Sequence, residues 1–423
     1  MSNIEKVSDL ESAPRINPAF TAWLGAAAST AASAQVGGIP WWGYILIILM
    51  LYGLFYLLNK IYWVLETPGN IRARLRNFTD KYNFYGDQRS SRRGLLQYLN
   101  ELKQTGVPET HFALTNFYTC AANTAATFTP QRDGISSPEA LRLTLAAGAR
   151  YLDLSIWNGG RSTGYHPFIA EMQPGSKWRR ITMNELSFAA AMGAIQKYAL
   201  AGPFAAADIS EAPYRDDPLI IMLRFCGKPH NKTFDAVAKA LADTIEPYRL
   251  DFTYYKGRGA DRLWKTPINE FMRKVIVISN MYPPETNRLD DYINVGPRGA
   301  VPLEMTSKEI IAIPDASKAD FRAKIMQNLT ITRDPMDEPS GDGNDVNWKA
   351  AHALGIQYAA MNFWSLDDNL KSYRGVFGVN SFIIKPPEMR YIIEYAKPPL
   401  LPNPELNARD GKPRAPAGII LPG

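Results

Sequence analysis

The chain contains little cysteine and little histidine. Its 423 residues include two cysteines and four histidines, and no CxxC pair occurs. This scarcity excludes a disulfide framework and a cysteine zinc site, and it favours a reducing compartment. The histidines also lack the spacing of a metal site. No metal site built on these residue types is therefore predicted.

Charged residues are absent between Arg15 and Lys60. This stretch ends in a dense apolar run from Trp41 to Leu58. About 18 to 24 such residues in a helix span a hydrocarbon core about 30 Å thick. A transmembrane helix is therefore predicted over residues 39–64, with aromatic residues at both ends, as is typical of membrane interfaces. A buried core helix is the competing interpretation, which the length and the flanking charges disfavour.

Lysine and arginine are distributed unequally about this run. Two precede it, and eight lie between Lys60 and Arg93. By the positive-inside rule, we expect a single-pass membrane protein with its N-terminus outside and its C-terminal domain cytosolic. The basic segment either contacts anionic lipid headgroups or only fixes the topology. Ser2, in place of glycine, excludes N-myristoylation.

The remaining composition is that of a folded protein. Hydrophobic residues make up 46% and charged residues 21%, which is ordinary for a globular domain. The net charge of +6 is too modest to indicate nucleic-acid binding. Three segments are expected to flank the globular part: a disordered Ala/Ser-rich N-terminus (1–38), a basic helical connector (65–107) and a Pro-rich tail (397–423).

Short apolar runs alternate with amphipathic stretches from about residue 108. We expect strands over 151–156, 218–225, 274–279, 309–313, 356–363 and 381–384. We expect helices over 138–149, 183–199, 233–245 and 318–326. Strands separated by helices imply parallel βαβ units. Six to eight such units fit a (β/α) barrel, whose chemistry lies at the C-terminal ends of its strands.

Six segments carry a further pattern, namely 117–125, 153–159, 165–167, 218–224, 355–363 and 378–390. In this order they resemble the X and Y regions of phosphoinositide-specific phospholipase C, in the PLC-like phosphodiesterase superfamily. The firmest is Gly-Ile-Gln-Tyr-Ala-Ala-Met-Asn-Phe at 355–363, which is similar to the family's Gly-Cys-Gln-Met-Val-Ala-Leu-Asn-Phe. The resemblance implies an α/β fold: a distorted (β/α)8 TIM-type barrel, here preceded by one transmembrane helix. An X-like half would cover 108–290 and a Y-like half 291–396.

The resemblance also implies catalytic and calcium-binding positions, from which this chain departs. The first catalytic histidine position falls on Ala122, whose methyl group cannot move a proton, while the second is retained as His166. The family's calcium ligands fall on Asn123, which is kept, and on Asp153, Ser155 and Arg224, which are not.

The change to Arg224 has the largest expected effect on calcium binding, because a guanidinium cannot lose its charge. At 4 Å its repulsion of a dication is about 8 kcal/mol at an effective dielectric constant near 20. We therefore expect the calcium site to be lost, with no cofactor in its place. We expect Arg224 to pair with Asp153 instead.

The phosphate-binding positions of the family have changed as well. Its lysines fall on Ile278 and Asn280, which carry no charge. Its substrate arginine and tyrosine fall near Thr330, Thr332 or Arg333. The expected substrate-binding residues of this chain are Asn123, Asp153 and Arg224, with His166 as the one retained catalytic side chain.

These departures favour a membrane-anchored pseudoenzyme that acts as a binding or structural module at a membrane surface. Its expected partners are the bilayer and either a phosphoinositide headgroup or a protein. A lipid-sensing module and a structural component of a viral or organellar envelope remain open. The enzymatic alternative is a phosphoric diester hydrolase with metal-independent chemistry that uses His166, Asp153 and Arg224.

Overall fold

The computed structural model describes residues 43–58, 93–128, 134–161, 164–173, 179–180, 182, 184–202, 214–254, 260–284, 286–297, 302–333 and 344–393. The chain divides into two compact units, Met1–Arg74 and Leu75–Gly423. Three predicted segments lie wholly or mostly outside the described residues, namely 1–38, the basic part of 65–107, and 397–423.

The described part of the first unit, residues 43–58, is a helix. Its large apolar side chains are exposed; Met50, for example, has an exposed fraction of 75%. The span predicted over 39–64 extends beyond the described residues at both ends. Among the helices that are described, none combines the length and the apolar character needed to cross a bilayer.

A mixed sheet forms the centre of the second unit. Its described path runs β10-β9-β4-β1-β13-β12-β11, and every neighbouring pair along it is parallel. These strands are β1 (Phe117–Asn123), β4 (Tyr151–Asn158), β9 (Leu219–Phe225), β10 (Val275–Ser279), β11 (Leu303–Thr306), β12 (Thr330–Arg333) and β13 (Tyr358–Asn362). This is the strand order of a (β/α) barrel. Because no pairing joins β10 to β11 in the described ranges, barrel closure remains a prediction.

Shorter strands extend the sheet at its margins. β14 (Phe382–Ile384) pairs antiparallel with β1, and β5 (Pro167–Ile169) pairs antiparallel with β4 and with β8 (Leu186–Ser187). Two separate hairpins join β2 (Thr127–Phe128) to β3 (Ile135–Ser136) and β6 (Met172–Gln173) to β7 (Arg179–Arg180).

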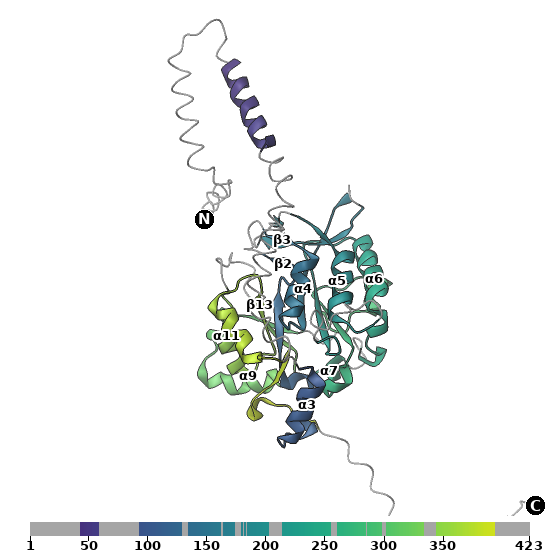
Figure 1. Cartoon of the computed structure of the whole chain (residues 1–423), viewed down its shortest axis with the longest axis vertical. Helices are drawn as coiled ribbons and strands as arrows, with labels where there is room; N and C mark the ends of the chain where they lie inside the picture. Colours follow the sequence, from purple (N-terminus) through teal and green to yellow (C-terminus); the bar gives the residue numbers. More distant parts are fainter. Residues whose placement is uncertain are drawn as a thin grey trace, which may run out of the picture. The chain divides into compact units, whose positions relative to one another are not determined.

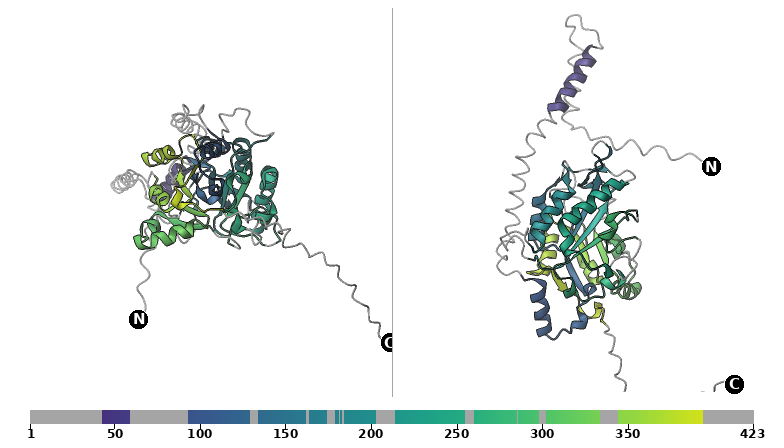
Figure 2. Two further views of the ribbon diagram at one scale, coloured as in Figure 1. Left: turned by 90° about the horizontal axis from the view of Figure 1, so that it is seen from below. Right: turned by 90° about the vertical axis from the view of Figure 1, so that its right-hand side faces the viewer.

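Helices surround the strands of this unit, as the two views of Figure 2 show. On one flank, α5 (Phe188–Ala199) packs against both α4 (Pro138–Ala146) and α6 (Asn231–Ile245) (Figure 1). The other helices are α3 (Leu95–Gln104), α7 (Ala260–Leu263), α8 (Ser307–Ile311), α9 (Lys318–Ile325), α10 (Trp348–Leu354) and α11 (Asp368–Phe377). Ser137 caps α4, since its side chain accepts a hydrogen bond from the Glu139 amide, and Pro138 occupies the first turn.

Most of the predicted elements are confirmed, and two need correction. The strand predicted over 309–313 is wrong, because this segment belongs to helix α8. Thr306 and Glu309 form a reciprocal capping box there, which satisfies amides at the start of the helix. The helix predicted from residue 183 begins only at Phe188, since Ser187 is its N-cap. Strands β1, β11 and β12 of the main path were not among the predicted strands, and neither were the short strands β2, β3, β5, β6, β7 and β8.

The inner face of the sheet is built by the two-residue alternation of its strands. Apolar side chains from six strands pack together there and are almost completely buried. They include Ala121, Tyr151, Met222, Ile278, Ile331 and Ala360. The alternation places Asn123, Asp153, Arg224, Arg333 and Asn362 on the same inner face, two residues further along their strands.

A buried lysine connects β14 to the end of α10. Lys385 is completely buried, and its Nζ donates a hydrogen bond to the carbonyl oxygen of Gly355, 2.5 Å away. Gly355 ends α10 with a φ of +97°, a conformation that favours glycine. Burial lowers the pKa of Lys385 to about 7.

This lysine predicts how stability depends on pH. Between pH 7 and 9.5 the unfolded state binds a proton on Lys385 that the folded state has released. The free energy of unfolding should therefore rise with pH, by at most about 1.4 kcal/mol per pH unit from this group. Lys385→Met should lose that contribution, as measured by denaturant titration at several pH values. Equal pH slopes for the two proteins would contradict the prediction.

Candidate functional site

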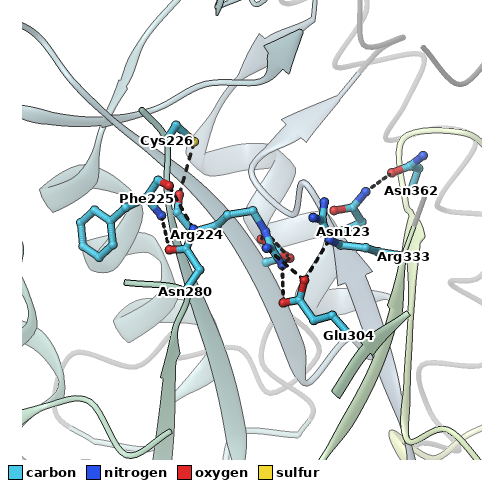
Figure 3. Close-up of polar contacts among 9 residues, drawn as sticks. Asn123, Arg224, Phe225, Cys226, Asn280, Glu304, Arg333 and Asn362 are labelled. Carbon is cyan, nitrogen blue, oxygen red and sulfur yellow. Dashed lines mark hydrogen bonds and ion pairs between the residues drawn. The ribbon is translucent and has the colours of Figure 1, made fainter. Parts of the chain in front are cut away.

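Four charged side chains meet on the inner face of the sheet. Asp153, Arg224, Glu304 and Arg333, which we call the charge cluster, come from β4, β9, β11 and β12. Each strand contributes one of them, so the cluster exists only once the sheet has formed. Figure 3 shows Arg224 reaching toward Glu304, with Arg333 on the other side of that carboxylate.

The ion pair between Arg224 and Asp153, which the sequence predicted, is present. Nη2 lies 2.7 Å from Oδ2, and Nε lies 3.1 Å from both carboxylate oxygens. The side chains are 5% and 1% exposed, respectively. Such a bidentate contact is the favoured geometry of a guanidinium and a carboxylate, and burial strengthens the attraction.

Glu304 extends the pair into a network. Arg224 Nη2 lies 3.2 Å from its Oε1, and Arg333 Nε lies 3.6 Å from its Oε2. Burial opposes the charge of Arg224, but Asp153 and Glu304 outweigh it and raise the pKa of this arginine. Burial also acts to raise the pKa of Glu304, yet Arg224 and Arg333 hold it below its usual value. The two cations and two anions compensate one another.

Calcium, which the family resemblance implies, does not fit these residues. The Arg224 guanidinium fills the space between Asp153 and Glu304, and its N–H groups use oxygens that an ion would need. Calcium takes six to eight oxygen ligands, usually with several carboxylates. Within the described ranges, no three His, Cys, Asp or Glu side chains are grouped so as to hold a metal ion.

Two asparagines near the cluster are committed to structural hydrogen bonds. Asn123 Nδ2 donates to Asn362 Oδ1 across the paired strands β1 and β13 (Figure 3). The side chain of Asn280 both accepts from the amide and donates to the carbonyl of Phe225. Asn280 therefore fixes the ends of β9 and β10, and Ile278 is part of the apolar core.

His166 makes no contact with the charge cluster. It is exposed, in the turn before β5, and its backbone carbonyl accepts from the Gly159 amide. Its imidazole makes no polar contact with the described part of the chain. Ala122 is fully buried, and it alternates with Asn123, so its methyl group points away from the inner face.

The sequence left the substrate-arginine position open among three residues, and the structure separates them. Arg333 shares its strand face with Ile331 of the core, whereas Thr330 and Thr332 point to the other side. Arg333 Nε faces Glu304, and no other polar contact of its guanidinium is found within the described ranges. Burial and the neighbouring Arg224 lower the pKa of Arg333.

Two acidic side chains of this region were missed. Glu304 lies on β11, a strand that the sequence pattern did not reveal. Glu171 follows β5 and is 5% exposed; its Oε1 accepts a hydrogen bond from Thr127 Oγ1 at 2.9 Å. Burial raises the pKa of Glu171 to about 8, against the hydrogen bond from Thr127 and together with repulsion from Asp153. The sequence alone does not reveal that a single glutamate in a loop will be buried.

Comparison with known proteins shows the fold. No family model matches, and no curated protein matches. Among solved structures, PLC21 of L. pealei aligns with a TM-score of 0.52 at 15% identity, and PLC21 of S. officinalis with a TM-score of 0.53 at 17%. The alignments cover 68% of this chain and 39% of each of those chains. This chain therefore has a phospholipase-C-like α/β fold and spans well under half the length of those relatives.

Because the Arg224–Asp153 pair is buried, we expect the single variant to lose much more free energy of unfolding than the double variant. Arg224→Met leaves the Asp153 carboxylate buried without a partner and should lower the free energy of unfolding by about 3–5 kcal/mol. Arg224→Met combined with Asp153→Leu should recover most of that loss. Denaturant titration measures both.

The exposed pair Lys239–Asp243 of α6 supplies the matched control. Its two side chains are 76% and 59% exposed. Lys239→Met should therefore cost less than about 1 kcal/mol. A comparably small cost for Arg224→Met would show that the buried pair is not needed for stability.

Proposed function

We propose that this protein is a phospholipase-C-like pseudoenzyme that binds a phosphate-bearing headgroup at a membrane surface. One observation carries this conclusion: the Arg224 guanidinium lies between the carboxylates of Asp153 and Glu304. The family resemblance implies that a cation would occupy this position. A permanent charge there replaces the ion structurally, while it offers no exchangeable ligand positions for chemistry.

Arg333 supports the binding role. Its side chain is 16% exposed, and its guanidinium has a single, long contact with Glu304 within the described ranges. The other charged groups of the cluster already hold partners at hydrogen-bond distance. Since guanidinium groups bind phosphate oxygens well, Arg333 is the side chain best placed to receive an anionic headgroup.

Membrane attachment belongs to the same proposal. Two neighbouring segments would contribute to bilayer binding. The uncharged run that includes helix 43–58 provides apolar surface, and the basic residues that follow it provide electrostatic attraction. In this arrangement the N-terminus is outside and the phospholipase-C-like unit is cytosolic. The headgroup would then be met at the cytosolic leaflet.

The second candidate is a metal-independent phosphoric diester hydrolase, which the phospholipase neighbours of the fold support. It requires a base and an acid near the phosphate. Both Asp153 oxygens accept hydrogen bonds from Arg224, which weakens Asp153 as a base. His166, the retained histidine, is exposed and forms no contact with the cluster. The geometry therefore favours binding over turnover.

The binding proposal is tested with a soluble headgroup, glycerophosphoinositol, and the full chain in detergent at physiological salt. Loss of a charged hydrogen bond costs about 1.5–3 kcal/mol, so Arg333→Gln should weaken binding roughly 10- to 100-fold in calorimetry. Arg273→Gln is the matched control, because Arg273 pairs with Asp216 just before β9 begins, at the opposite end of the strands. Equal affinities of wild type and Arg333→Gln would refute the proposal.

A release assay with phosphatidylinositol vesicles distinguishes the two candidates. Wild type and His166→Ala should show equal, background turnover, with or without added calcium. Calcium should also leave the melting temperature unchanged, because a ligand stabilises only a protein that binds it. Turnover that His166→Ala abolishes would instead establish the hydrolase.

A further inference from the structure

We propose that Glu304 restricts the site to headgroups with a single negative charge, such as a phosphodiester monoanion, and rejects headgroups that carry further phosphate groups. This inference rests on the proposed binding function and deepens it, because it names the class of ligand. It also assigns a role in selectivity to a residue that the sequence pattern did not reveal.

The Glu304 carboxylate lies between the two guanidinium groups of the charge cluster, as Figure 3 shows. Its Oε1 lies 3.2 Å from Arg224 Nη2, and its Oε2 lies 3.4 Å from Arg224 Nη1 and 3.6 Å from Arg333 Nε. The parallel register places Glu304 opposite Ile331, which belongs to the inner face. Glu304 is therefore a negative charge held beside Arg333, the guanidinium proposed to receive the ligand.

Glu304 and Arg333 are the accessible members of the cluster. Their side chains are 31% and 16% exposed, whereas those of Arg224 and Asp153 are 5% and 1% exposed. Burial acts to raise the pKa of Glu304, but Arg224 and Arg333 hold it below its usual value, so the carboxylate is ionised at neutral pH. A ligand bound to Arg333 therefore meets the negative charge of Glu304.

The charge balance favours a ligand with one negative charge. The cluster carries no net charge, since two guanidinium groups face two carboxylates. The single charge of a phosphodiester is offset by Arg333, whereas each phosphomonoester group adds about 1.5 to 2 negative charges at pH 7. Repulsion between like charges about 6 Å apart, at an effective dielectric constant near 20, corresponds to about 100-fold in affinity. Further phosphate groups should therefore weaken binding.

The cluster offers no further cation to offset additional phosphate groups. Arg224 directs its N–H groups to Asp153 and Glu304. The two positions where the family resemblance implies lysines are neutral: Ile278 packs in the core, and Asn280 holds the backbone of Phe225. Among the described residues, no other cation forms an ion pair with Asp153 or Glu304.

The experiment compares two soluble probes, glycerophosphoinositol and its 4,5-bisphosphate, by calorimetry with the full chain in detergent at neutral pH and physiological salt. Wild type should bind the singly charged probe at least about tenfold more tightly. Glu304→Gln removes one negative charge and keeps the size of the side chain, so it should bind the bisphosphate at least about tenfold more tightly than wild type does. Glu304→Asp keeps the charge and should keep the preference of wild type.

Glu109→Gln is the matched control. Glu109 pairs with Lys103 and precedes β1, at the opposite end of the strands from the cluster, and its side chain is 64% exposed. This variant removes the same charge from the protein and should leave both affinities unchanged. Denaturant titration shows whether each variant is folded.

The outcomes separate the selectivity role from the binding function. If wild type binds the singly charged probe and Arg333→Gln weakens that binding, but Glu304→Gln leaves the preference unchanged, the role of Glu304 is refuted while the binding function stands. The same conclusion follows if wild type binds the bisphosphate as tightly as the singly charged probe. If wild type binds neither probe, the binding function itself has failed.

Discussion

The buried ion pair between Arg224 and Asp153 constrains the whole inner face of the sheet. A carboxylate that is 1% exposed requires a partner, because the cost of leaving it uncompensated is a large part of a domain's stability. The partner comes from the neighbouring strand β9, and Glu304 and Arg333 arrive from β11 and β12. Charge compensation thus depends on strand positions that are far apart in the sequence.

In the proposed function, this compensation would take the structural place of a metal ion in a phospholipase-C-like fold. An ion between Asp153 and neighbouring oxygens would connect several strands at once. The Arg224 guanidinium makes equivalent connections with fixed N–H directions and a charge that does not dissociate. In the proposed function, this guanidinium would hold the strands together and favour anion binding. Unlike a metal ion, it would not lower the pKa of a hydroxyl and so would not activate a nucleophile.

Two other buried titratable groups show how the fold uses neutral forms. Lys385 is placed at the C-terminal end of α10, where its Nζ meets the Gly355 carbonyl, and Glu171 is placed where Thr127 satisfies one of its oxygens. Burial lowers the pKa of Lys385 and raises the pKa of Glu171, so it favours the uncharged form of each side chain. The two groups differ in their surroundings: Lys385 lies against the end of α10, whereas Glu171 experiences repulsion from Asp153.

The amino-acid sequence alone determined the α/β class and the pairing of Arg224 with Asp153. It also located strands β4, β9, β10, β13 and β14 and helices α4, α5, α6 and α9. Local patterns suffice for these, since apolar periodicity and N-caps act over a few residues, and a buried unpaired charge is costly in any fold. The sequence pattern missed β11 and β12 because both are short, and it missed β1 because most of that strand consists of small or polar residues (Thr, Cys, Ala, Ala, Asn). It mistook α8 for a strand because a five-residue helix is too short to show helical periodicity. Only the tertiary structure decided that Glu304 and Arg333 join the cluster, that His166 is exposed, and that Glu171 is buried. These outcomes depend on which strands become neighbours, and that is set by the packing of the whole sheet.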